Sequence, residues 1–131
     1  MKDKENNIPK PTEAELEILQ VLWQSGPATV REVHEKLAEK RDIGYTTTLK
    51  NMQNMVQKAM LTRDEESRSH IYHAQLQQKQ TQQMLLDRFM ESAFGGSAMN
   101  LVMQALGNRK TSKEDLQKIR ALINKLEGGE K

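Results

Sequence analysis

The chain has 131 residues, a formal net charge of +2 and no cysteine. This length fits one ordinary domain, or two small units that share a core with a partner, and the lack of cysteine excludes a disulfide scaffold and every thiolate metal site. Aromatic residues make up only 4% of the chain. A large self-sufficient core is therefore not expected, although eight Met residues supply adaptable apolar surface.

The chain begins with a polar segment. Residues 1–7 contain no apolar signal segment, which favours a cytoplasmic protein with no direct membrane insertion. Pro9 and Pro11 cannot continue a helix, so residues 1 to about 11 are expected to form an extended arm.

Two short helices are predicted next, each opened by a capping box. Thr12 and Glu15 have this spacing, and Thr29 and Glu32 repeat it. The first helix should end at Ser25-Gly26-Pro27 and the second before Asp42. The expected buried stripes are Leu16, Leu19, Leu22 and Trp23 in the first helix and Val30, Val33 and Leu37 in the second.

A third helix is predicted over residues 45–59, where Gly44 breaks the chain and Thr46 or Thr47 can cap the start. Its apolar residues recur at helical spacing and are Leu49, Met52, Met55, Val56 and Ala59. Its opposite face carries Thr46, Thr47, Lys50, Asn54 and Gln57. Hydroxyls, amides and an ammonium can donate to phosphates or read base edges, and no catalytic acid or base lies among them.

A β-hairpin should follow the third helix. Leu61 to Arg63 form the first expected strand, residues 64–67 a polar turn, and residues 68–73 a second strand in which Ile71 alternates with polar neighbours. Three short helices and a small antiparallel wing of two or three strands make a winged helix, a common reader of DNA.

Charge is distributed unevenly along this half of the chain. Five basic residues and one acidic residue lie between Lys40 and Arg63, which gives this segment a charge of +4. The first helix holds Glu13, Glu15 and Glu17 in one turn, where they can stabilise the helix dipole. A positive strip in front of a negative one is what orientation against a polyanion requires.

Residues 77–131 are predicted to form three more helices, and the chain divides naturally after Leu76. Apolar stripes in these helices are Leu85, Leu86, Phe89, Met90 and Ala93, then Ala98, Leu101, Val102, Ala105 and Leu106, then Leu116, Ile119, Ile123 and Leu126. Three stripes in so short a segment have too little to bury against one another. We therefore expect a mainly α protein, with a winged helix over residues 1–76 and a helical dimerisation arm over residues 77–131.

The sequence resembles the penicillinase and methicillin-resistance repressor (BlaI/MecI) family over nearly its whole length. The resemblance rests on the run from Pro11 to Leu19, on Leu22-Trp23, on Tyr45-Thr46-Thr47, and on Lys58, Arg63, Arg68 and Tyr72. It implies a homodimeric repressor of resistance genes that binds a palindromic operator. It also implies release when a membrane-embedded sensor protease leads to cleavage of the repressor. This chain departs from the family pattern at Asn54, where Arg is usual, at Ala59, where Gly usually follows Lys, and at Ser67, where a wing Gly is common.

Roles for individual residues follow from the winged-helix reading. Thr46, Thr47 and the helix N-terminus should hold a phosphate, and Lys50, Asn51 and Asn54 should reach the major groove. Arg63 and Arg68 should bring the wing to the adjacent backbone or minor groove. Tyr45 can either donate to a phosphate or pack in the core.

The cleavage site implied by the family falls in the expected helix that follows Gly95-Gly96. Aligning Leu101-Val102-Met103 with relatives, which are cut at an Asn-Phe bond, places Gln104-Ala105 at that bond. Ala105 lies on an apolar stripe expected to be buried, so a cut there would break the helix and remove the dimer.

Other readings were considered against these. A copper-sensing repressor of the same fold is disfavoured because such relatives carry a cluster of cysteines near the C-terminus. The remaining alternatives are a winged-helix module that binds protein and a repressor that responds to another ligand. No nucleophile triad, paired inward carboxylates or phosphate loop is visible, so we expect neither an enzyme nor a cofactor. His70 and His73 should point to opposite faces of a strand and His34, expected on the surface of the second helix, lies on another element, so no metal site is expected.

Overall fold

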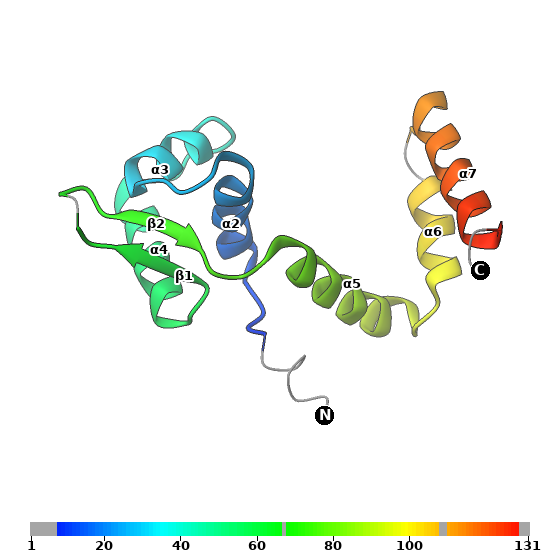
Figure 1. The fold of residues 1–131 in the computed structure, drawn as a ribbon, viewed down its shortest axis with the longest axis horizontal. Helices are drawn as coiled ribbons and strands as arrows, with labels where there is room; N and C mark the ends of the chain where they lie inside the picture. The colour runs from blue at the N-terminus through cyan, green and yellow to red at the C-terminus, as the bar shows by residue number, and fades with distance from the viewer. Residues whose placement is uncertain (1–7, 67, 108–109, 129–131) are drawn as a thin grey trace. The chain divides into compact units, whose positions relative to one another are not determined.

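The computed structural model describes residues 8–66, 68–107 and 110–128. The expectations for residues 1–7 and for Ser67 lie outside these residues. In chain order, the described elements are α2 (Glu13–Ser25), α3 (Val30–Ala38), α4 (Tyr45–Gln57), β1 (Leu61–Asp64), β2 (Ile71–Ala74), α5 (Gln78–Phe94), α6 (Ala98–Gly107) and α7 (Lys113–Gly128) (Figure 1). Three helices, a two-stranded hairpin and further helices confirm the mainly α, winged-helix fold class.

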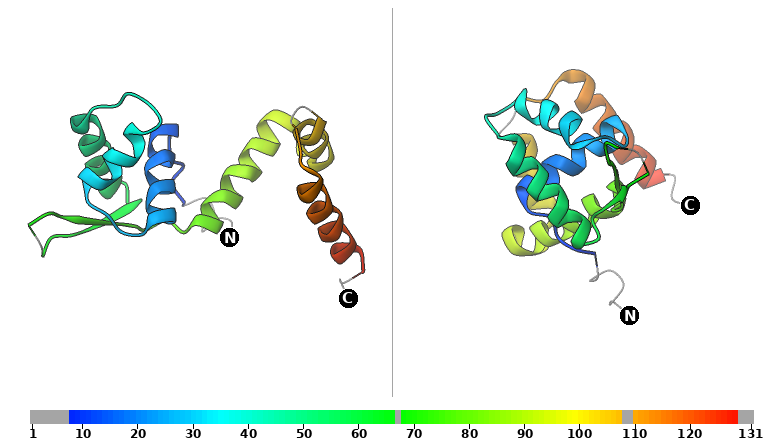
Figure 2. Two further views of the ribbon diagram at one scale, coloured as in Figure 1. Left: turned by 90° about the horizontal axis from the view of Figure 1, so that it is seen from above. Right: turned by 90° about the vertical axis from the view of Figure 1, so that its left-hand side faces the viewer.

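The chain forms two compact units that meet between Leu86 and Asp87, inside α5. In the first unit, α2, α3 and α4 gather together and the tip of the β1–β2 hairpin projects beyond them (Figure 2). The division expected after Leu76 falls at the linker before α5. No helix in the described part of the chain has the length and apolar character needed to cross a membrane.

Both predicted capping boxes are present. The hydroxyl of Thr12 accepts the Glu15 N–H at 3.2 Å, and the Glu15 carboxylate accepts the Thr12 N–H at 3.0 Å. Thr29 and Glu32 make the same reciprocal pair at 3.2 and 2.9 Å. These short-range bonds satisfy backbone N–H groups that a helix start leaves without partners, which is why they could be read from sequence.

The core of the first unit lies between α2, α3, α4 and the wing. Its buried apolar residues are Ile18, Leu19, Leu22, Ala28, Val30, Val33, Leu37, Met52, Met55, Met60, Leu61 and Tyr72. The expected stripe of α2 omitted Ile18, which is 1% exposed, whereas Leu16 and Trp23 are only half-buried. The reason is that α2 contacts α3, α4 and β2 together, so its buried face is rotated and wider.

The start of α4 differs from the prediction. Its N-cap is Gly44, which provides no side-chain cap, and Thr46 and Thr47 lie in the first helical turn. Thr48, which was not expected in the core, is fully buried and donates its hydroxyl to the Gly44 carbonyl at 3.3 Å. Leu49 and Val56 are half-buried, so the centre of the buried face is Met52 and Met55.

The end of α4 was also placed too late. Ala59, expected in the apolar stripe, lies beyond the helix, is exposed and has a φ of 65°. The Ala59 N–H donates to Val56 and the Met60 N–H donates to Met55, at 3.1 and 2.9 Å. This pair of bonds commonly closes a helix on a left-handed residue, which is usually Gly.

The wing is a two-stranded antiparallel sheet in which Leu61 pairs with Ala74 and Asp64 with Ile71. Tyr72, rather than Ile71, is the buried residue of β2 at 2% exposure. Its backbone forms two hydrogen bonds with Ala28, which extends the hairpin by a single bridge in place of a third strand. The second strand begins at Ile71, so Arg68 precedes it in the loop.

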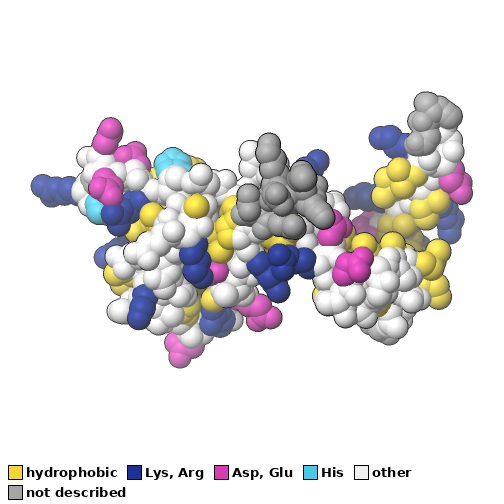
Figure 3. Space-filling model, turned by 90° about the horizontal axis from the view of Figure 1, so that it is seen from below, with side chains coloured by type: hydrophobic (Ala, Val, Ile, Leu, Met, Phe, Trp, Pro, Cys, Tyr) yellow, Lys and Arg dark blue, Asp and Glu magenta, His cyan; other side chains and the backbone are white. Residues whose placement is uncertain are grey.

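The second unit buries almost none of its apolar stripes. No described residue of α6 or α7 is buried. Exposed apolar side chains are Phe89, Met99, Val102, Met103, Leu116, Leu122, Ile123 and Leu126, and hydrophobic side chains are visible on this surface in Figure 3. Ala98, Val102 and Ala105 are exposed in the single chain, so the burial expected for their stripe stays a prediction that requires a partner.

We predict that Ala59→Gly stabilises the first unit by about 1 kcal/mol, because glycine adopts a positive φ without the clash of a Cβ. Gly26 is the matched control. It has a φ of 86° at the end of α2, with open space where a Cβ would lie, so Gly26→Ala should destabilise by a similar amount. Urea unfolding followed by circular dichroism measures both. An Ala59→Gly variant less stable than the parent would contradict the strain at this position.

Candidate nucleic-acid interface

The packing of α4 determines which of its side chains face solvent. Met52 and Met55 are fully buried, and the exposed polar residues around them are Thr46, Thr47, Lys50, Gln53, Asn54 and Gln57. Asn51, predicted to reach a base edge, is half-buried at the margin of this surface. The exposed face therefore presents hydroxyls, amides and one ammonium, the groups that recognise phosphates and bases.

The N-terminus of α4 keeps its backbone donors free of a side-chain cap. Thr12 and Thr29 cap the two preceding helices, whereas Gly44 has no side chain to do so. The N–H groups of a first helical turn have no intrahelical acceptor. Those of α4 lie beside the exposed hydroxyls of Thr46 and Thr47, so the two residues adjoin a set of donors suited to an anion.

Tyr45 lies at the surface rather than in the core. Its side chain is 46% exposed and makes an edge-to-face contact with His34, with ring centroids 5.8 Å apart. His34 is half-buried rather than at the surface as expected. Its Nε2 lies 2.9 Å from the Ile43 carbonyl oxygen, so the histidine supports the loop before α4. The contact orients the Tyr45 ring at the helix start.

A groove of about 420 Å³ lies between the start of α3, one edge of α4 and the wing. It brings together three residues that the sequence analysis had singled out separately, Tyr45, Arg63 and Arg68. Arg31, His70 and Gln53 also line it, and sequence reasoning missed them. No carboxylate is among its described lining residues. Arg31 lies two residues after the capping residue Thr29 and has no basic neighbours in the sequence. Its place in the groove is therefore seen only in the folded structure.

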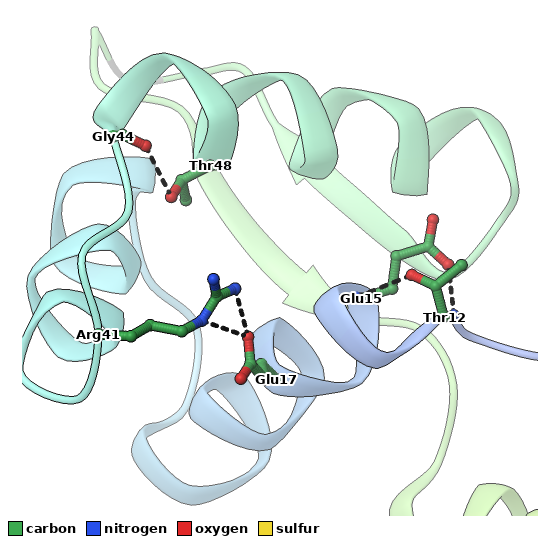
Figure 4. Close-up of polar contacts among 6 residues, drawn as sticks. All are labelled: Thr12, Glu15, Glu17, Arg41, Gly44 and Thr48. Carbon is green, nitrogen blue, oxygen red and sulfur yellow. Dashed lines mark hydrogen bonds and ion pairs between the residues drawn. The ribbon is translucent and has the colours of Figure 1, made fainter.

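The positive strip expected between Lys40 and Arg63 is partly neutralised. Arg41 forms an ion pair with Glu17 at 2.7 Å, Lys58 pairs with Glu15 at 2.6 Å, and Arg63 pairs with Glu65. Figure 4 shows the Arg41–Glu17 pair together with the Thr12 and Thr48 hydrogen bonds. Within the described residues, Lys40 and Lys50 are the members of the strip that form no ion pair.

The pair between Glu15 and Lys58 belongs to the fold rather than to the interface. Burial raises the pKa of the Glu15 carboxyl, but hydrogen bonds from the Lys58 ammonium and the Thr12 N–H outweigh it and leave the pKa below its ordinary value. The Glu15 side chain is 7% exposed, so its charge needs these donors. Lys58 thus connects the end of α4 to the start of α2, and Glu15 and Glu17 do more than complement a helix dipole.

The pair between Arg63 and Glu65 is of another kind, because Glu65 lies in solvent and Arg63 is only partly covered. Hydrogen bonding to Glu65 and Tyr72 raises the pKa of the Arg63 guanidinium, and Arg63 in turn lowers the pKa of Glu65. Exposed ion pairs contribute little to stability. A phosphate arriving at the wing can therefore replace Glu65 as the partner of Arg63 at small cost.

Among the described residues, no group of three or more His, Cys, Asp or Glu is arranged to hold a metal ion. His70 and His73 lie before and within β2, and His34 lies on α3.

Comparison with known proteins places these features in a family. Residues 11–125 match the family described as "Penicillinase repressor". The chain is 36% identical over 56 residues to the transcriptional regulator BlaI of Mycobacterium tuberculosis, a match that covers 42% of this chain and 41% of that protein. The chain thus spans less than half the length of this relative.

Two further relatives match over most of their length. The penicillinase repressor of Bacillus licheniformis is 21% identical over 116 residues, which cover 88% of this chain and 91% of that protein. The methicillin resistance regulatory protein MecI of Mammaliicoccus sciuri is 17% identical over 121 residues, which cover 92% and 98%.

Proposed function

Because the chain belongs to the penicillinase repressor family, a family of transcriptional repressors without enzymatic activity, we propose that it binds double-stranded operator DNA as a cytoplasmic homodimer. The observation that carries the proposal is the exposed polar face of α4 beside a groove lined by arginines. We further propose that it controls β-lactam-resistance or related genes, as the names of its relatives suggest.

Recognition of DNA divides between reading and anchoring. Lys50 and Asn54, with Asn51 at the margin, would reach base edges in the major groove, since they lie on the exposed side of α4. Thr46, Thr47 and the uncapped N–H groups would hold a phosphate. Arg63 and Arg68 would anchor the wing to the backbone, with the Tyr45 hydroxyl beside them.

Dimerisation is supported by the uncovered apolar surface of the second unit. Leu116, Ile123 and Leu126 are 41%, 49% and 60% exposed, and with the half-buried Ile119 they repeat nearly as a heptad along α7. Contiguous apolar surface of this kind usually marks an interaction site. A second copy of the chain supplies an identical stripe, so the proposed interface comprises Leu85, Phe89, Leu101, Val102, Ala105, Leu116, Ile119, Ile123 and Leu126.

Release by proteolysis completes the proposed cycle. The bond between Gln104 and Ala105 lies inside α6, and both side chains are exposed. Cutting there would separate α7 from the DNA-binding unit and so remove the part of the proposed dimer surface that α7 carries. Two linked half-site contacts bind far more tightly than one, so loss of the dimer would free the operator. A membrane sensor protease would either cut this bond itself or trigger its cleavage.

The first prediction separates base reading from backbone anchoring. Asn54→Ala should relax sequence preference at one operator position, at a cost of about 1–3 kcal/mol, because an amide that pairs with a base edge is lost. Arg68→Ala should weaken binding to all sequences and reduce the salt slope by about one unit. Salt titrations on operator and random duplex DNA measure both. Equal losses on the two DNAs for both variants would remove Asn54 from the groove.

The second prediction concerns the dimer. Ile123→Asp should give monomers with much weaker operator binding, because association would bury an unpaired carboxylate. Ile123 is 49% exposed in the single chain, so the substitution should leave the fold intact. Ala121→Asp adds the same charge on the opposite face of α7 and should preserve the dimer. Sedimentation equilibrium decides, and a wild-type monomer that binds operator at full affinity would refute the role of α7.

The third prediction addresses release. In cells exposed to an inducing β-lactam, mass spectrometry should detect a fragment that ends at Gln104, produced by a protease that accepts a small residue after the cut. The bond differs from the Asn-Phe pair at which relatives are cut, so the Ala105→Phe variant tests whether the residue after the cut affects cleavage. Uninduced cells show whether the fragment depends on the inducer. Intact chain at full derepression would exclude cleavage.

A further inference from the structure

α3 borders two grooves whose lining residues differ in charge. Arg31 lies near the start of this helix and is one of the residues that line the groove beside α4 and the wing. A second groove of about 290 Å³, between α3 and α2, is lined by Glu32, Glu35 and Glu39, with Lys36 as its basic residue. A polyanion would be attracted to the first groove and repelled from the second.

The three arginines that line the groove differ in whether they already form an ion pair. Arg63 is held by Glu65. Among the described residues, Arg31 and Arg68 form no ion pair, and both are exposed. Two guanidinium groups that form no ion pair therefore line one groove from two elements, α3 and the loop that precedes β2.

From this arrangement we propose that Arg31 contacts a backbone phosphate of bound DNA. The phosphate lies in the groove, with Arg31 on the α3 side of it and Arg68 on the wing side. Guanidinium groups bind phosphate oxygens through paired N–H donors. Thr29 also lines this groove, and its hydroxyl accepts the Glu32 N–H while keeping its own proton to donate, but the arginine is the residue that brings a positive charge to this end of α3. The inference rests on the proposed function and adds a third anchoring element, α3, to α4 and the wing.

This contact would position the protein on DNA and raise its affinity, but it would not read the base sequence. A phosphate is the same at every base pair, so Arg31 would strengthen binding to every duplex. Because it lies on a helix of the core rather than on the wing, it would fix the distance at which α4 enters the major groove.

The test compares the parent with Arg31→Ala, Arg31→Lys, Lys36→Ala and Arg68→Ala on operator and random-sequence duplex DNA over a range of salt concentrations. Arg31→Ala should weaken binding to both DNAs by a similar factor and reduce the salt slope by about one unit. Arg31→Lys should restore the slope, since it keeps the charge. Lys36→Ala, which removes a cation from the acidic side of the same helix, should leave the slope unchanged. All should unfold at the same denaturant concentration as the parent, because none of these side chains is buried.

The outcomes separate this inference from the proposed function. If Arg68→Ala reduces the slope but Arg31→Ala does not, Arg31 makes no contact and the inference fails while DNA binding stands. If Lys36→Ala reduces the slope as much as Arg31→Ala, the effect is one of net charge and the inference also fails. If the wild-type chain binds no duplex at low salt, the proposed function itself is wrong.

Discussion

The burial of Met52 and Met55 is the constraint on which the arrangement of the first unit depends. Both side chains are fully enclosed between α2, α3 and the wing, and burying a side chain of this size contributes about 1.5–3 kcal/mol. Rotating α4 would expose one of them and bury Lys50 or Asn54 in its place. Exposed ion pairs contribute at most about 1 kcal/mol, so apolar packing rather than charge fixes which face of α4 is offered to a ligand.

Charge then determines how that face can be used. The Glu15–Lys58 pair commits one cation of the expected positive strip to the fold, and Glu17 offsets the charge of Arg41 at the surface. What remains for a polyanion is the groove lined by Arg31, Arg63 and Arg68, with Lys50 on the face of α4. A net charge of only +2 is compatible with DNA binding, because the few cations that are free to bind DNA lie close together on one surface.

The sequence was informative wherever structure depends on neighbours in the chain. Capping boxes at Thr12 and Thr29 span three residues, and both were predicted correctly. The predicted cap and the predicted end of α4 were wrong, because the cap is the backbone of Gly44 and the helix ends where Ala59 adopts a conformation that alanine rarely takes. Arg31 could not be predicted as part of the site, since the wing that completes its groove lies far along the chain. The apolar stripes of α6 and α7 were recognised, but their expected burial requires something outside one chain.

The central claim is that the outer face of α4 and the arginine groove together form the surface that contacts DNA. Backbone amide chemical shifts of the full-length, isotopically labelled protein, recorded during titration with duplex DNA, test it most directly. The largest shifts are expected at Arg31, at Tyr45 to Thr47 and in the wing around Arg68, with little change at Glu39, on the acidic edge beside α2 that follows α3. Shifts centred on that acidic edge, or no shifts at low salt, would contradict it.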